Sequence, residues 1–101
     1  MHYLLIYDVV HDYVERRARH RQQHIALARE AVARGDLVLA GALANPADEV
    51  VLLFRGGSPE AAEAFAKADP YVTSGIVTRW RVREWTTVVG PDAEAPLPQS
   101  K

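Results

Sequence analysis

The residue best suited to proton transfer in this sequence is a histidine on the first predicted helix. His24 follows Arg17 and Arg21, and at 100° per residue the three side chains lie within roughly a 60° arc of the helix. Ionisable residues on the side where a helix turns toward the core are expected at functional sites. An imidazole exchanges protons near neutral pH, and a guanidinium binds anionic oxygens. Alternatively, the arginines extend toward solvent and His24 is a half-buried surface histidine.

A second histidine raises the question of a metal site. His20 and His24 are four residues apart, a spacing that can present two nitrogens to one metal ion. No acidic residue stands between them as in His-Glu-x-x-His, and His20 is predicted to turn further toward solvent. We therefore expect no metal at this position.

Three residues later in the chain have two possible roles each. Asp69, at the end of the second predicted helix, either forms a turn with its own backbone or hydrogen-bonds a histidine and fixes its tautomer. Gly41 either lets a ligand approach the backbone or forms a bulge or turn. Tyr71 either hydrogen-bonds a ligand at a pocket rim or buries its ring to fix the connection from helix to strand.

Six predicted elements must position these side chains. Alternating or continuous apolar runs predict strands, and 3.6-residue periodicity and end signals predict helices. The strands are residues 3–10, 36–41, 49–55 and 76–89, and the helices are residues 13–34 and 58–69. The order βαββαβ predicts an α+β, ferredoxin-like fold, in which a four-stranded antiparallel sheet carries two helices on one face.

The first helix is predicted from a stripe that is apolar except at one position. A spacing of four and three residues relates Val14, Ala18, Arg21, Ile25, Ala28 and Val32. This spacing is typical of the inward face of an amphipathic helix, and Gly35 suits the position after its end. Arg21 therefore interrupts a face that we expect to be buried.

Composition limits the kinds of partner. The chain has 101 residues, 49% of them apolar, a net charge of −1 and no cysteine. These values predict one soluble domain without disulfides or a cysteine nucleophile. We expect a cytoplasmic protein with no membrane span and no nucleic-acid partner. Arg79, Arg81 and Arg83 on one strand face would suit nucleic acid, but a solvated strand face explains them better at this net charge.

Two helices can cover only one face of the predicted sheet. The other face needs a cover because the central strands are apolar. A second copy of the sheet is the simplest cover, so we expect a homodimer with facing sheets. Residues 90–101, rich in proline, are predicted to be a loose tail or an arm that orders against a partner subunit.

Several of these residues together resemble the YciI-like, or YCII-related, family. The resemblance rests on Arg21-x-x-His24-Ile25, on Gly35, Leu37 and Ala40-Gly41, and on the stretch AKADPYVTSG at residues 66–75. It implies a YciI-like domain over residues 1–89 with the dimeric α+β barrel form of the fold, related to muconolactone isomerases. It further implies that His24 and Asp69 are the family's catalytic His–Asp pair and that Arg21 is its motif arginine.

The resemblance also implies a function. One relative is a dehydrochlorinase that acts on a chlorinated hydroxyhydroquinone. We therefore expect a cofactor-free lyase, isomerase or dehydrochlorinase for a cyclic or aromatic anionic small molecule, with His24 as general base or acid and Asp69 orienting it. Arg21, Arg17, Gly41 and Tyr71 are the expected substrate-binding residues. The alternative is a non-catalytic dimeric module that binds a small ligand or assists a larger enzyme.

This sequence departs from the common family pattern at two segments. Residues 42–48 are shorter than the corresponding loop of many relatives, and the segment after residue 89 is longer. Both segments are expected to line or rim the pocket, so they bear on which substrate is bound.

Overall fold

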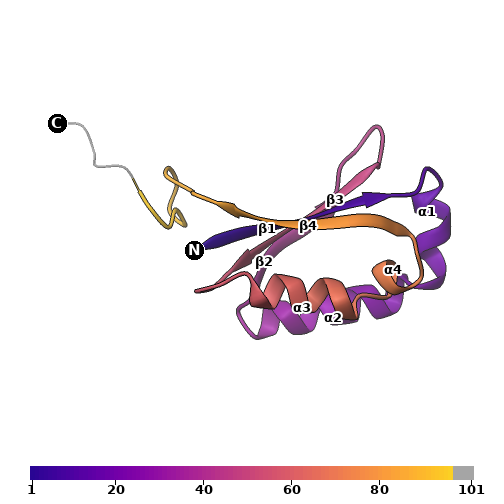
Figure 1. The fold of residues 1–101 in the computed structure, drawn as a ribbon, viewed down its shortest axis with the longest axis horizontal. Coiled ribbons are helices and arrows are strands. Elements are labelled where there is room, and N and C mark those ends of the chain that lie inside the picture. Colours follow the sequence, from indigo (N-terminus) through magenta and orange to yellow (C-terminus); the bar gives the residue numbers. More distant parts are fainter. Residues whose placement is uncertain (97–101) are drawn as a thin grey trace.

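The computed structural model describes residues 1–96, and it confirms the predicted ferredoxin-like α+β fold (Figure 1). The elements in chain order are β1 (His2–Val9), α1 (Tyr13–Arg16), the 3₁₀ turn η1 (Arg17–Arg19), α2 (Arg21–Ala33), β2 (Leu37–Ala42), β3 (Glu49–Arg55), α3 (Glu60–Ala68), α4 (Pro70–Thr73) and β4 (Val77–Trp85). The strands form one antiparallel sheet in the order β2-β3-β1-β4. Helices α2 and α3 lie on the same face of this sheet (Figure 1).

The core lies between the sheet and these helices. Side chains alternate across a strand, so Tyr3, Leu5 and Tyr7 of β1 are buried whereas the residues between them are partly exposed. Their partners on β3, namely Phe54, Leu52 and Val50, are buried on the same face. Tyr7 is thus a polar aromatic residue on the inner face of a central strand.

The prediction of one continuous helix over residues 13–34 is wrong. The chain is helical over Tyr13–Arg16, tightens into η1, and restarts as α2 at Arg21. A 3₁₀ turn advances 120° per residue in place of 100°, so the phase of the predicted stripe is lost there. Val14 and Val32 of that stripe are 54% and 53% exposed.

The inward face of α2 differs from the predicted one. The buried residues of α2 are His24, Ala28 and Ala31, whereas Arg21 is exposed. Small alanines let the helix approach the sheet closely, and the imidazole of His24 lies on the face that approaches. His24 is therefore not the half-buried surface histidine that the alternative interpretation required.

Among residues 1–96, no helix covers the opposite face of the sheet. A hollow of about 630 Å³ there has an almost entirely apolar lining, made by Leu4, Leu39, Ala40, Gly41, Val51, Leu53 and Trp85. Leu39 is 71% exposed and Trp85 is 48% exposed. Toward the other end of this face, Arg81 lies 3.3 Å from Asp8 and 3.7 Å from Glu49. Acidic neighbours of this kind are what a solvated, ion-paired strand face contains.

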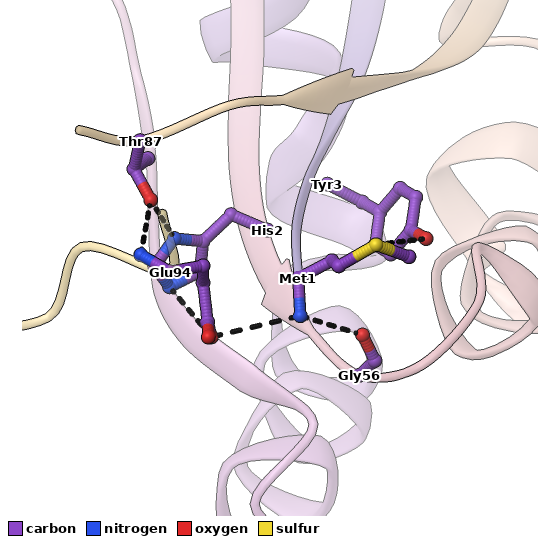
Figure 2. Close-up of polar contacts among 6 residues, drawn as sticks. All are labelled: Met1, His2, Tyr3, Gly56, Thr87 and Glu94. Atoms are coloured by element: carbon purple, nitrogen blue, oxygen red, sulfur yellow. Dashed lines mark hydrogen bonds and ion pairs between the residues drawn. The ribbon is translucent and has the colours of Figure 1, made fainter. Parts of the chain in front are cut away.

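The segment after β4 folds back onto the start of β1 (Figure 2). Thr87 Oγ1 lies 2.8 Å from His2 Nδ1 and accepts a hydrogen bond from the backbone N–H of Glu94 at 2.9 Å. Glu94 Oε1 lies 3.7 Å from His2 Nε2. The strand predicted to reach residue 89 ends at Trp85. Of the predicted tail at residues 90–101, the last five residues lie outside the described part of the chain.

Within residues 1–96, no helix combines the length and the apolar composition needed to cross a bilayer.

Candidate functional site

A fully buried carboxylate is the centre of the site. Asp69 lies between α3 and α4, is 0% exposed, and accepts a hydrogen bond from the backbone N–H of Tyr71 to Oδ1 at 3.0 Å. This is the turn that the Asp-Pro sequence predicted. A buried carboxylate needs further partners because an unpaired charge in the interior is very costly.

The same carboxylate contacts His24. Nδ1 of His24 lies 2.9 Å from both Oδ1 and Oδ2 of Asp69. An ionised carboxylate only accepts hydrogen bonds, so Nδ1 carries the proton and, in the neutral ring, Nε2 carries the lone pair. Both roles considered for Asp69, the turn and the histidine partner, therefore occur together in one side chain.

The third side chain of this group, Tyr7, was not predicted from the sequence. The Tyr7 hydroxyl donates to Asp69 Oδ2 at 2.7 Å. Burial raises the pKa of Tyr7 far above its ordinary value, and the charge of Asp69 raises it further, so the hydroxyl stays protonated and remains a donor. The signal was present in β1, because a tyrosine on the inward face of a buried strand needs a hydrogen-bond partner.

Aromatic rings fix the orientation of the imidazole. The rings of His24 and Tyr71 are stacked, with centroids 3.9 Å apart and an angle of 9° between their planes. Phe65 contacts the imidazole edge-on at 6.2 Å, and Tyr13 contacts Tyr71 edge-on at 5.8 Å. Tyr71 is completely buried, which is the packing role considered for it. An imidazole held on its face and at its Nδ1 has little freedom to rotate.

A cavity of about 400 Å³ lies along α2 and β2 and has His24 in its wall. This volume falls within the range of small-molecule sites. The cavity is lined by five of the six predicted site residues, namely Arg17, Arg21, His24, Gly41 and Tyr71. The sixth, Asp69, is outside the lining and contacts His24 from behind.

The cavity has a cationic and an apolar part. Arg17 and Arg21 come from η1 and the start of α2, and the Arg17 guanidinium lies 5.0 Å from the centre of the Tyr13 ring. Arg29, which also lies on α2, lines the cavity as well and was not among the predicted residues. Apolar residues of β2 form the wall across from them, so the cavity suits an anion with an apolar body.

Gly41 lies in the β2 wall of the cavity. A Cβ atom placed on it would meet nothing within 4 Å in this chain. The irregularity in the pairing of β2 with β3 falls between Leu37 and Leu39, so Gly41 does not form the bulge considered for it. Its role toward a ligand stays a prediction.

His20 does not share the cavity of His24. It precedes α2 and lines a separate hollow with Glu15, Arg16 and Arg19 among others. In the described part of the chain, no three His, Cys, Asp or Glu side chains come together in a way that could hold a metal ion.

Comparison with known proteins shows a family and a similar solved structure. The family model of the YCII-related domain matches residues 1–86. The structure of 5-chloro-2-hydroxyhydroquinone dehydrochlorinase from Burkholderia phenoliruptrix AC1100, in complex with 2,5-dihydroxybenzoquinone, has a TM-score of 0.71 and 16% sequence identity, covering 86% of this chain and 95% of that chain. At this identity the likeness shows the shared fold. No curated protein matches the sequence.

Proposed function

The chain belongs to the family of YCII-related domains, and from this premise we propose that it is an enzyme acting on small molecules by acid–base catalysis. The proposed substrate is a cyclic or aromatic anionic compound, and the proposed reaction is an elimination or isomerisation. The observation that carries the proposal is the position of His24, which lies between a fully buried carboxylate and the wall of a cavity.

His24 is the proposed general base and acid. Its Nδ1 is held by Asp69, so Nε2 is the nitrogen available to take a proton from the substrate and to return it. The carboxylate stabilises the imidazolium that forms and keeps the ring in the required tautomer. All of these steps use groups of the chain itself.

Arg17 and Arg21 are the proposed substrate-binding cations. They line the same cavity as His24, and a guanidinium can donate two parallel hydrogen bonds to one carboxylate or bind a single oxygen anion. An anionic ring compound held by these arginines would lie with its reacting atom near the imidazole.

Loss of HCl from a chlorinated hydroxyhydroquinone is one reaction that such a site can carry out. A base removes one hydroxyl proton while a proton is added to the ring carbon that bears chlorine. Loss of a second hydroxyl proton then expels chloride with the electron pair of the C–Cl bond, so the net loss is HCl and the ring becomes a hydroxyquinone without an external oxidant. The similar dehydrochlorinase, by its name, acts on such a compound. The acid–base part of this reaction matches the proposed role of His24.

The test is release of chloride from 5-chloro-2-hydroxyhydroquinone. We expect the wild-type protein to release chloride faster than buffer alone. Arg21→Gln should raise KM by about 10-fold or more, because a hydrogen bond to a charged group is worth about 1.5–3 kcal/mol. Arg55→Gln is the matched control, since Arg55 is exposed and lies outside the cavity. Binding of the compound without chloride release would favour the ligand-binding module.

We also propose that the chain forms a homodimer through the sheet face opposite the helices. Leu39 and Trp85 are exposed there beside an apolar hollow, and a second copy of the same face offers a matching apolar surface. Light scattering at micromolar concentration should give twice the mass of one chain, and Leu39→Glu should give the mass of one chain. Val14→Glu, at an exposed valine of α1, should leave the mass unchanged. A single-chain mass for the wild type would refute the proposal.

A further inference from the structure

The hydroxyl of Tyr71 is buried without a hydrogen-bond partner among the described residues. The whole side chain is 0% exposed, so water cannot reach the hydroxyl in this arrangement. Buried polar groups nearly always have a partner, and an unpaired one destabilises the folded chain. Tyr7 is equally buried, but its hydroxyl is bonded to Asp69. The hydroxyl of Tyr71 therefore lacks an acceptor for its hydrogen, whereas the hydroxyl of Tyr7 has one.

The charged neighbours of Tyr71 cannot supply the missing acceptor. Burial raises the pKa of Tyr71, Tyr13 adds to this effect, and the positive charges of Arg21 and Arg17 oppose it. Arg21 also acts on the hydroxyl oxygen as a nearby donor, although no hydrogen bond of regular geometry joins the two side chains. The hydroxyl is thus protonated at neutral pH and has a hydrogen to donate. A guanidinium has donors and no acceptor, so neither arginine can accept this hydrogen, however close its side chain comes.

We propose that the Tyr71 hydroxyl and the Arg21 guanidinium form a subsite for one oxygen anion of the ligand, a carboxylate, phenolate or enolate oxygen that accepts from both groups. The subsite rests on the proposed function, because it belongs to the cavity that contains His24. The tyrosine supplies a directional donor and the arginine supplies the opposite charge.

We expect a movement of Arg21 to open access to the subsite. The hydroxyl is covered in the free protein, but Arg21 is exposed and forms no ion pair within residues 1–96 that would hold its side chain in place. Side-chain rearrangements of this size are common when a ligand binds. Because the Tyr71 ring is stacked on His24, an oxygen bound to this hydroxyl anchors the ligand beside the imidazole.

Thermal unfolding of two phenylalanine variants tests the free hydroxyl. Tyr71→Phe keeps the ring and its stacking and removes only the unpaired group, so we expect Tm to rise by several degrees. Tyr7→Phe is the matched control, because it removes a paired hydroxyl from an equally buried ring and should lower Tm. A lower Tm for Tyr71→Phe would show that its hydroxyl is already paired in the free protein and would overturn the proposal.

Calorimetric binding tests the ligand anion. The probes are 2,5-dihydroxybenzoquinone, which loses protons to become an anion, and 2,5-dimethoxybenzoquinone, which stays neutral. We expect the wild type to prefer the first probe and Tyr71→Phe to bind it about 10-fold more weakly, with no change for the neutral probe. Unchanged affinity for the anion in Tyr71→Phe, or no binding of it by the wild type, would overturn the subsite.

These results separate the subsite from the proposed catalysis. Binding is measured without turnover, so anion binding that depends on Tyr71 together with no chloride release refutes the catalytic proposal alone. Chloride release with an anion affinity that Tyr71→Phe does not change refutes the subsite alone.

Discussion

Replacing His24 with glutamine should lower kcat/KM for chloride release by about 10²–10⁴-fold, the range that general acid–base catalysis contributes. Glutamine is close to histidine in size, and its amide N–H can donate to Asp69 in place of Nδ1. It cannot take up a proton from the substrate. The variant therefore removes proton transfer while it preserves most of the polar contact behind the ring.

His20→Gln is the control for this prediction. His20 precedes the same helix, lines a different hollow, and has no carboxylate bonded to its ring within residues 1–96. The kcat/KM of the His20→Gln variant should match that of the wild type. Thermal unfolding of both variants checks that the fold is intact. A His24→Gln variant that folds and retains wild-type kcat/KM would exclude His24 as the proton-transfer group.

The strands could be predicted from the sequence because each strand signal is local. The apolar and aromatic run at residues 3–10 predicted a buried strand, and the structure buries Tyr3, Leu5 and Tyr7 of β1. The break in the first helix could not be predicted in this way. The residues of η1 are compatible with an α-helix, so no local signal in the sequence marks the tighter turn. Because the break was not predicted, the helical phase assigned to the residues after it was wrong. Arg21 was therefore assigned to a buried face although it is exposed.

The same distinction between local signals and long-range contacts applies to the candidate site. The motif around Asp69 and the arc of His24 and Arg21 could be read from spacing and from the family resemblance. The bond from Tyr7 to Asp69 joins positions 62 residues apart, and only the sheet topology brings them together. The Tyr71 hydroxyl lacks a hydrogen-bond partner among the described residues, and the spacing of residues along the chain cannot predict which buried polar groups lack partners.

The contacts of Asp69 make it the residue on which both stability and the proposed chemistry depend. It accepts hydrogen bonds from the Tyr7 hydroxyl, His24 Nδ1 and the Tyr71 backbone N–H while it is fully buried. Three donors from three segments of the chain thus converge on one carboxylate. A substitution there leaves donors unpaired in the interior, and it also frees the imidazole to adopt the other tautomer.

Asp69→Asn should therefore destabilise the protein by about 3–5 kcal/mol, the cost of removing one partner of a buried charged pair, and should abolish measurable chloride release. The asparagine has one acceptor oxygen for three donors, and its NH₂ group must face another donor. A domain of this size has about 5–15 kcal/mol of total stability, so urea unfolding should show a clearly lower midpoint.

Asp36→Asn is the control, because Asp36 pairs with Arg34 at 3.1 Å near the surface, and such pairs contribute at most about 1 kcal/mol. Equal midpoints for the two variants would mean that Asp69 carries no buried charge, and neither the tautomer assigned to His24 nor its proposed role as a base would then stand.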